Sequence, residues 1–376
     1  MLAVNVHFQG GVSNLTMNYS HPRNMLAIRL LMLSLFVLAI QSLLLSSFSS
    51  AANPTQHAFH IQDQWNVGGA GGWSHLVLDA PAHRLYISRA NRIMVVDTET
   101  GKVAGEVEGL TSARGIALDS AGKFGYVTDL TDGTAGFVRV FDRSSLKLVA
   151  SIPTGADPDA IVFAPASNAI LAFNTRGHSA ILIDTATNQV AATIPLPGRP
   201  AQAVVDSDNT VFVTVPSLAL LVRMDPAQKK ITASFPLASC TGPSGLAIDT
   251  AHRQLLTTCE DHKLVAINAD TGHVSPVGQV PAGTGDIDFV PKLNLLFVAG
   301  IDGTLSILHR ESPNRYVRFQ QIKTLPGART MTTSRQTSKA YLVTSKYGQN
   351  TAATSEELQF RPTPVPGTFS VIVVGR

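Results

Sequence analysis

A short segment that ends in a turn-forming residue recurs seven times along this chain of 376 residues. It reads HLVLD at 75–79, GIALD at 115–119 and GLAID at 245–249, and successive copies end 40 to 45 residues apart. A second apolar segment, which ends at Asp97 in its first copy and at Asp142 in its second, keeps a similar period. Two segments that share one period indicate a repeat architecture, in which each unit buries its faces against its neighbours.

Each repeat is expected to form four antiparallel strands. Between the two recurring segments lies a run rich in β-branched and aromatic residues, such as VFVTV at 211–215. After the second segment come a turn and a last run, such as AATIPLPG at 191–198. Turns made of Asp, Asn and Gly between such runs are typical of hairpins. No stretch of about 12 residues combines helix formers with a 3.6-residue period, which excludes βαβ folds.

The predicted fold is therefore an all-β, seven-bladed β-propeller with four antiparallel strands per blade. The seventh repeat ends at Arg376, after its third strand at 368–376. The strand-like run HAFHIQDQWNV at 57–67 has no other place in the repeat pattern. We expect it to complete the last blade, because a ring closed in this way protects its sheet edges.

The first 52 residues resemble a secretory signal. They contain two strong bases and no acid, and an apolar run at 30–40 is followed by small residues up to Ala52. A membrane anchor needs about 20 apolar residues, whereas Gln41 and Ser42 interrupt this run. A cleaved signal is therefore favoured over an uncleaved anchor.

The expected organisation is an N-terminal extension and signal at 1–52, with Met1 or Met25 as the start, and a propeller at 53–376. The last blade carries an insertion at 347–367, which separates its recurring segments by more than one period. Export predicts a periplasmic or secreted protein with no stable membrane span after signal cleavage.

Three motifs carry a resemblance to a known family. The sequence GYVTD at 125–129, the DTxTG turn at 97–101 and the PxGLAID run at 243–249 resemble the YVTN-type β-propeller repeat family. That family comprises exported bacterial propellers, including the YncE-like proteins. The resemblance covers about residues 57–376 and implies a seven-bladed propeller in the periplasm or on the cell surface, without an agreed catalytic function.

The candidate binding residues come from one face of the predicted ring. In a propeller, the loops that lead into the first strand and those that leave the second strand share the face around the central channel, and function usually lies on such loops. We expect a ligand-binding rim there, with no catalytic residue assigned. Its polar residues are His75, Arg114, Asp159, Asn174, Arg176, His178, Glu260, His262, Asp286, Asp302 and Arg329.

A divalent cation at this rim is the main alternative. Lactonase-like propellers bind such a cation with carboxylates and amides, and His75, His178, Glu260, His262 and Asp302 could meet across the channel. These residues come from separate repeats, however, and only Glu260 and His262 are close in sequence. We therefore predict neither a metal site nor a cofactor, and keep a divalent cation as the alternative.

Other cofactor and enzyme signatures are absent from the sequence. It contains no C-x-x-C-H motif for covalent haem and no G-x-S-x-G elbow for a hydrolase. The glycines at 68–72 precede a short strand instead of a helix, which argues against a dinucleotide loop. The family also resembles propellers associated with haem modification and quinoprotein pathways, so handling of a haem or quinone cofactor remains an alternative.

The chain has two cysteines. Cys240 lies in the loop leading into the fifth repeat, and Cys259 lies at the end of the second strand of that repeat. Both positions are on the same predicted face, one strand apart, and an exported compartment would maintain a bond between them. We predict a structural disulfide, with two buried thiols as the alternative.

The charge balance narrows the class of partner. The chain has 29 Lys and Arg against 26 Asp and Glu, and two of those bases lie in the signal. This near-neutral balance argues against nucleic acid as the partner. The predicted function is a monomeric, exported, non-catalytic scaffold that binds a small molecule or an exported protein. The alternative is a metal-dependent, lactonase-like hydrolase or a haem- or quinone-handling protein that uses the same channel mouth.

Overall fold

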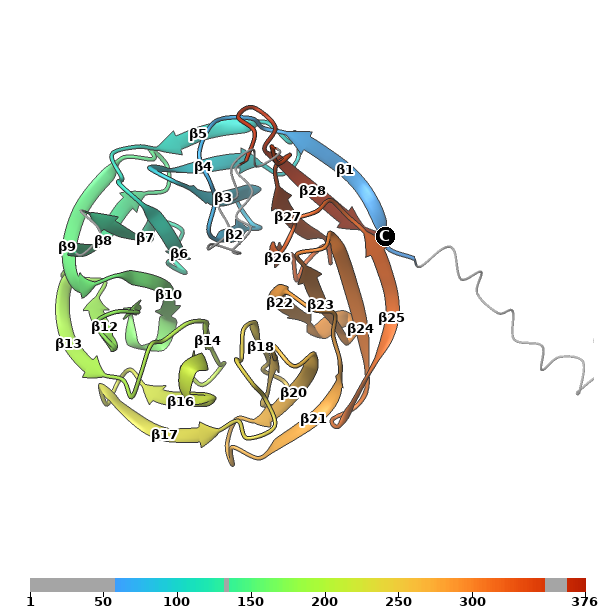
Figure 1. Cartoon of the computed structure of the whole chain (residues 1–376). Helices are drawn as coiled ribbons and strands as arrows, with labels where there is room; N and C mark the ends of the chain where they lie inside the picture. The colour runs from blue at the N-terminus through green and yellow to red at the C-terminus, as the bar shows by residue number, and fades with distance from the viewer. Residues whose placement is uncertain (1–57, 132–134, 349–363) are drawn as a thin grey trace, which may run out of the picture. The chain divides into compact units, whose positions relative to one another are not determined.

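A computed structural model describes residues 58–131, 135–348 and 364–376. The predicted signal at 1–52 and the central part of the predicted insertion lie outside these residues. Across the described parts, 28 strands form seven antiparallel sheets of four strands each. The sheets are arranged as blades around a common axis (Figure 1). The prediction of an all-β, seven-bladed propeller is confirmed.

The strands are given blade by blade, each from the innermost strand outward. Blade one contains β2 (Leu76–Asp79), β3 (Arg84–Arg89), β4 (Arg92–Asp97) and β5 (Val103–Val107); blade two β6 (Ala113–Leu118), β7 (Phe124–Thr131), β8 (Ala135–Asp142) and β9 (Leu148–Ala156); blade three β10 (Pro158–Ala164), β11 (Ala169–Asn174), β12 (Ser179–Asp184) and β13 (Gln189–Pro195). Blade four contains β14 (Ala203–Val205), β15 (Val211–Val215), β16 (Leu220–Asp225) and β17 (Lys230–Pro236); blade five β18 (Leu246–Asp249), β19 (Gln254–Thr258), β20 (Lys263–Asn268) and β21 (Val274–Gln279). Blade six contains β22 (Thr284–Val290), β23 (Leu295–Gly300), β24 (Thr304–Ser312) and β25 (Arg315–Lys323); blade seven β26 (Thr330–Thr333), β27 (Ala340–Thr344), β28 (Ser370–Gly375) and β1 (His60–Asn66). Three short 3-10 turns complete the elements: η2 (Pro165–Ser167), η3 (Pro216–Leu218) and η4 (Pro291–Leu293).

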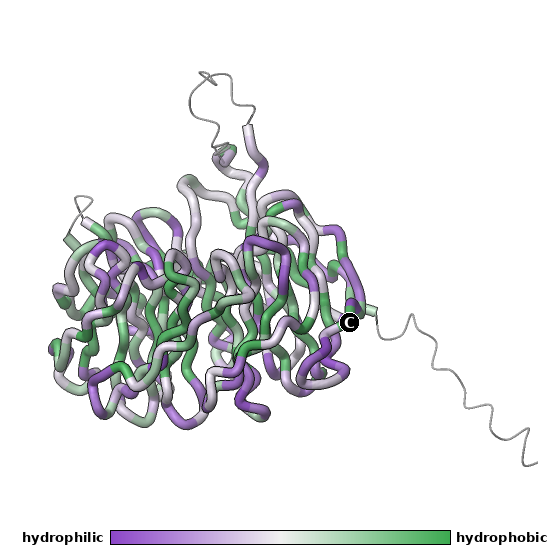
Figure 2. The backbone as a smooth tube through the Cα atoms, turned by 60° about the horizontal axis from the view of Figure 1, so that its bottom comes forward, coloured by the Kyte–Doolittle hydropathy of each residue, from purple (hydrophilic) through white to green (hydrophobic). Residues whose placement is uncertain are grey.

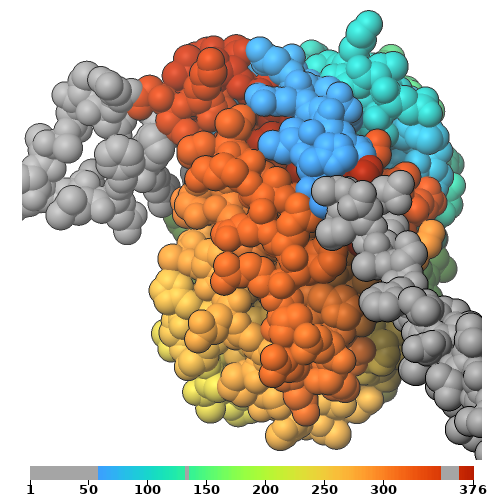
Figure 3. All heavy atoms as spheres, turned by 90° about the vertical axis from the view of Figure 1, so that its right-hand side faces the viewer, coloured from blue at the N-terminus to red at the C-terminus, as the bar shows by residue number. Residues whose placement is uncertain are grey.

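The N-terminal strand β1 closes the ring, as predicted. It pairs antiparallel with β28 of blade seven and lies on the outer surface beside the C-terminal residues (Figure 3). Just before β1, the backbone of Phe59 exchanges two hydrogen bonds with the side chain of Gln320 in blade six, at 2.9 and 2.7 Å. The Phe59 ring packs edge-on against Phe297, with centroids 5.3 Å apart. The segment at the start of β1 therefore joins blade seven to blade six as well as completing blade seven.

The core is divided among the seven contacts between neighbouring blades. Each buried apolar cluster combines residues of two adjacent sheets: one joins Leu171 and Phe173 of blade three to Val213 and Val222 of blade four, and six further clusters repeat this around the described part of the ring. The apolar stretches lie within the strands, and hydrophilic residues gather in the loops at both faces (Figure 2). Burial of both sheet faces explains why the charged fraction is only 15%.

The aspartates of the second recurring segment cap turns. One carboxylate oxygen of Asp97 accepts hydrogen bonds from the backbone N–H groups of Glu99 and Thr100, at 3.0 and 2.7 Å. Asp142 accepts equivalent bonds from Ser144 and Ser145. The Ser144 hydroxyl donates to the same carboxylate, and this bond, together with those from Ser145, lowers the pKa of Asp142 to about 2. The Asp side chain thus fixes the hairpin between the third and fourth strands of a blade.

The aspartates of the first recurring segment join neighbouring blades. Asp79 at the end of β2 pairs with Arg143 of blade two. The same position is Asp206 in blade four, which pairs at 2.8 Å with Arg253 of blade five. Each of these carboxylates is almost fully buried. At these two positions the Asp therefore accepts a charged hydrogen bond from the next blade, on the face where the first strands end.

Small residues allow the innermost strands to approach one another. A Cβ atom on Gly115 of β6 would lie 2.3 Å from the carbonyl oxygen of Asp159 in β10, and one on Gly245 would lie 2.8 Å from that of Gly285. Neighbouring innermost strands are in contact all around the ring. Glycine at these positions is required by close backbone contact near the axis. Within the described residues, no helix is long and apolar enough to cross a membrane.

Candidate functional site

The predicted rim residues lie at one end of the channel, but several of them belong to strands. The innermost strands β6, β10 and β22 begin earlier than the sequence indicated, so Arg114, Asp159 and Asp286 are strand residues rather than loop residues. Asn174 is the last residue of β11. We call this end of the ring the rim face: it carries the loops that lead into each innermost strand and those that follow each second strand.

An ion-paired cluster joins blades two and three on the rim face. Asp157, in the loop before β10, is buried; its carboxylate lies 3.2 Å from Nη1 of Arg114 and 3.6 Å from Nε of Arg176. The Thr175 hydroxyl donates to the same carboxylate. The structure therefore brings Arg114 and Arg176 together through Asp157, a residue of the same rim loops that was not among the candidate ligand-binding residues. Its signal in the sequence was weak, because a single Asp in a loop is most often solvated.

A small cavity on the axis collects residues from five blades. Its volume is about 140 Å³. The side chains around it come from the innermost strands and the residues before them: His75, Leu76, Gln202, Leu246, Asp286, Ile287, Asp288 and Met331. Two predicted residues, His75 and Asp286, therefore meet at the centre of the ring. The Nδ1 atom of His75 lies 2.9 Å from the hydroxyl of Ser74, which orients the imidazole.

Two carboxylates on β22 line the channel and bind the next blade. Asp286 Oδ2 accepts a hydrogen bond from the Met331 N–H at 2.9 Å, and Asp288 Oδ2 accepts bonds from the N–H and hydroxyl of Thr333, at 3.2 and 2.7 Å. Alternate residues of a strand share a face, so both carboxylates accept hydrogen bonds from the free edge of β26. Burial raises the pKa of Asp286 and of Asp288 above the ordinary value. Both groups are therefore costly to ionise.

The other predicted residues are dispersed or already engaged. Asn174 is buried and donates to the Thr154 carbonyl at 2.9 Å, which is a structural role. The Asp302 carboxylate caps its own turn through two bonds to Thr304. Glu260 and His262 are exposed in one turn of blade five, His178 is exposed in a turn of blade three, and Arg329 is exposed beside β26. Asp159 is half-buried in β10.

The geometry does not gather the residues considered for a cation. Among the residues that the structure describes, no three His, Cys, Asp or Glu side chains are grouped so that they could hold a metal ion. His75 lies on the axis, whereas Glu260 and His262 lie in the turn after β19 in blade five.

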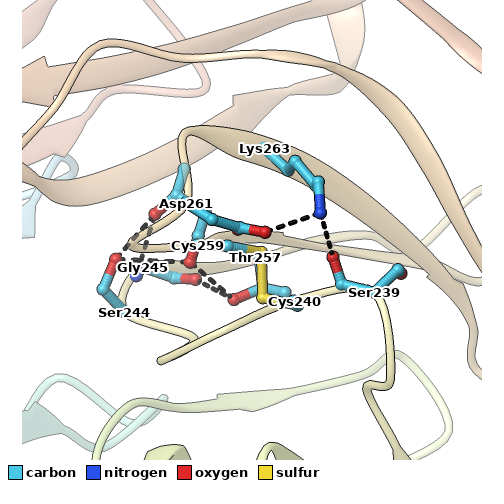
Figure 4. The surroundings of a disulfide bond; sticks show 9 residues. Ser239, Cys240, Ser244, Gly245, Thr257, Cys259, Asp261 and Lys263 are labelled. Atoms are coloured by element: carbon cyan, nitrogen blue, oxygen red, sulfur yellow. Dashed lines mark hydrogen bonds and ion pairs between the residues drawn. A yellow bond between two sulfur atoms is a disulfide. The ribbon is translucent and has the colours of Figure 1, made fainter.

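Cys240 and Cys259 form a disulfide in blade five, with Cα atoms 5.3 Å apart (Figure 4). Both residues are buried. Beside the bond, Nζ of Lys263 lies 2.6 Å from the Asp261 carboxylate and donates to the Ser239 carbonyl at 3.2 Å. The loop leading into β18 is therefore fixed to the start of β20 on the rim face.

A larger cavity, of about 590 Å³, opens at the opposite end of the channel. Asp288 borders both cavities. The charged residues of the larger cavity mostly bind one another: Arg143 pairs with Asp79 and, at 3.2 Å, with Asp119. Sequence reasoning missed this group, although the recurring terminal Asp of the first segment was a signal for it.

Comparisons with known proteins identify the fold. No protein-family model matches the chain, and no curated protein matches its sequence. A chain of Kuenenia stuttgartiensis hydrazine synthase superimposes with a TM-score of 0.65 at 16% identity, covering 72% of this chain and 92% of that chain. A chain of the mitotic checkpoint complex gives 0.68 at 13% identity, covering 87% and 95%. The RRP9 WD40 repeats give 0.66 at 8% identity, covering 84% and 97%. At these identities, the similarity establishes a β-propeller and nothing finer.

Proposed function

We propose that this chain is an exported, non-catalytic propeller that binds a partner protein across its rim face. The observation that carries the proposal is the convergence of side chains from five blades on one small axial cavity, surrounded by polar groups of both charge signs. The seven-bladed fold is commonly used as a scaffold for protein binding. Fold alone does not define function, and it is the features of the rim face that support protein binding.

The size of the axial cavity favours a protein over a small molecule. Sites that enclose a drug-sized ligand have volumes of about 300–1,000 Å³, whereas this cavity measures about 140 Å³. A partner would therefore lie across the face and insert at most a side chain into the channel. Arg329, Arg176 and Glu260 are exposed on the same rim face and offer polar contacts of both signs to such a surface.

Export is the second part of the proposal. The apolar run and small residues within 1–52 support it, as does the resemblance of the 97–101, 125–129 and 243–249 motifs to the YVTN-type exported propellers. The Cys240–Cys259 disulfide supports it further, because such bonds persist in oxidising compartments.

The test uses two arginines at opposite ends of β26. Arg329 precedes the strand on the rim face and Arg335 follows it at the opposite end, and both are exposed. The tagged full chain is expressed with its own N-terminus and cross-linked in intact cells, and the exported fraction is analysed by quantitative mass spectrometry. We expect one protein at near-equal amounts, retained by Arg335→Ala and depleted at least about fivefold by Arg329→Ala.

Three outcomes would contradict the proposal. Equal depletion by both variants would place the interface elsewhere, and retention of the full-length leader in the cytoplasmic fraction would refute export. A stoichiometric divalent cation or a visible chromophore on the purified protein would favour the lactonase-like or cofactor-handling alternative.

A further inference from the structure

A third pocket lies between blades five and six, at the end of the ring opposite the rim face. Its volume is about 350 Å³, which falls within the range of small-molecule sites. The side chains that line it include His252 in the turn before β19, His273 in the turn before β21, and Arg310 of β24. Gln254 and Tyr316 connect the two blades here through a hydrogen bond of 2.9 Å.

Arg310 is a buried cation with unused hydrogen-bonding capacity. Only 8% of its surface is exposed, and its Nε atom has no hydrogen-bond partner among the described residues. The nearby carboxylate of Asp249 lies 4.0 Å from that Nε, which is too long for a hydrogen bond. Buried polar groups normally have partners, and a buried guanidinium without a full set is costly. Oδ1 of Asp249 likewise has no hydrogen-bond partner in the described part of the chain, and both atoms are enclosed, so a ligand in the pocket would meet the remaining exposed part of the Arg310 side chain.

Among the described residues, only one oxygen of Asp249 is hydrogen-bonded to another side chain. Its Oδ2 atom lies 2.7 Å from Nδ1 of His252, and the carboxylate is fully buried. Since Nδ1 faces Asp249, the Nε2 side of the half-exposed imidazole remains for a ligand, and a protonated imidazole donates from both nitrogens. His273 lines the same pocket and contacts the Ser275 hydroxyl at 3.2 Å.

The pocket is rich in donors on several sides. Besides Arg310 and the two histidines, the amide of Asn314 and the hydroxyl of Ser275 line it. Arginine pairs well with phosphate and carboxylate oxygens, but a planar carboxylate offers only two oxygens to donors that come from three different turns and strands. A tetrahedral oxyanion presents oxygens in all of these directions.

From this geometry we infer that the pocket between blades five and six binds a phosphate group, either inorganic phosphate or the phosphate of a small phosphorylated molecule. Arg310 supplies the buried charge, and His252 and His273 supply donors at the mouth. The site is independent of the rim face, so it can be present whether or not a protein partner binds there.

The probe is inorganic phosphate, titrated into the folded full chain at constant ionic strength. Histidine Cε1–H signals in two-dimensional NMR report the site, and calorimetry gives the affinity. We expect the signals of His252 and His273 to shift together in a saturable way, while that of the distant His75 stays unchanged. Loss of one charged hydrogen bond corresponds to about a tenfold weaker affinity, so Arg310→Gln should weaken binding at least that much.

The matched control is Arg315→Gln, an exposed arginine of the same blade that pairs with Glu311 at 2.7 Å. It should leave the affinity unchanged. If Arg310→Gln does not fold, His252→Ala and His273→Ala serve instead, each expected to weaken binding about threefold to tenfold. Phosphate that shifts neither histidine, or equal loss from Arg315→Gln, overturns the inference. Acetate binding as tightly as phosphate would overturn the assignment of a tetrahedral oxyanion.

Discussion

Replacement of Arg143 tests whether charges between blades hold the ring together. Arg143 is 7% exposed and pairs with Asp79, also 7% exposed, and with Asp119 at 3.2 Å. It also donates to the Asp119 carbonyl at 3.0 Å. Arg143→Met keeps most of the side-chain volume but leaves two carboxylates without their cation. Removal of one partner from a buried pair costs about 3–5 kcal/mol.

The free energy of unfolding, measured by urea titration at pH 7, should therefore fall by about 3–5 kcal/mol. At about 2–4 °C per kcal/mol, the melting temperature should fall by roughly 10 °C. The double variant Arg143→Met with Asp79→Asn removes one of the stranded charges and should recover part of the loss, which a double-mutant cycle quantifies.

The exposed pair between Arg315 and Glu311 provides the control. Arg315→Met should change the free energy of unfolding by at most about 1 kcal/mol, because surface ion pairs contribute little. A loss at Arg143 no larger than this control, or no recovery in the double variant, would refute the reasoning that buried Asp–Arg pairs stabilise the contacts between blades.

Three further predictions concern the disulfide, the channel and the axis. Cys240→Ser opens a bond that closes a separation of 19 residues, and chain entropy predicts a loss of about 3 kcal/mol in urea unfolding; an unchanged midpoint would contradict it. The raised pKa of Asp288 means that its ionisation destabilises the folded state. The stabilisation from its protonated carboxyl is full below the unfolded-state pKa of about 3.9 and is lost as pH rises through the folded-state pKa. Asp288→Asn should therefore raise the melting temperature at pH 7, with the difference vanishing near pH 4, and a lower melting temperature at pH 7 would count against this sign. Gly115→Ala forces a Cβ within 2.3 Å of the Asp159 carbonyl and should cost about 1–3 kcal/mol by the same assay, whereas Gly72→Ala, with open space around it, should be near neutral; equal effects would show that the axis is not crowded.

The architecture could be predicted because its signals are local and repeated. Each recurring Asp has a local or neighbouring-blade function: Asp97 caps a turn within its own hairpin, and Asp79 binds the next blade. Because these residues recur at one period, the number of blades and the order of the strands can be read from the sequence without any knowledge of tertiary contacts. The closing role of β1 could be predicted because the seventh repeat lacks a fourth strand, and His60–Asn66 supplies that strand.

The candidate site was less predictable, because sequence places a residue on a face but does not choose its partner. Asp286 reached the axial cavity as expected, yet its carboxylate also binds the backbone of Met331. Asn174 was expected on the rim and is buried beneath it. Asp157, which pairs with Arg114, and Arg310, whose Nε lacks an acceptor, have no distinguishing local pattern.

The sequence alone therefore determined the repeat, the number of blades, the closing strand and the face to which loops contribute, because strand periodicity and turn chemistry act over a few residues. Only the tertiary structure decided which charges meet, since Asp79 and Arg143, or Asp249 and Arg310, are more than 60 residues apart in sequence and become neighbours only when blades pack. Burial at those contacts sets the cost of each charge, and burial is a property of the assembled ring.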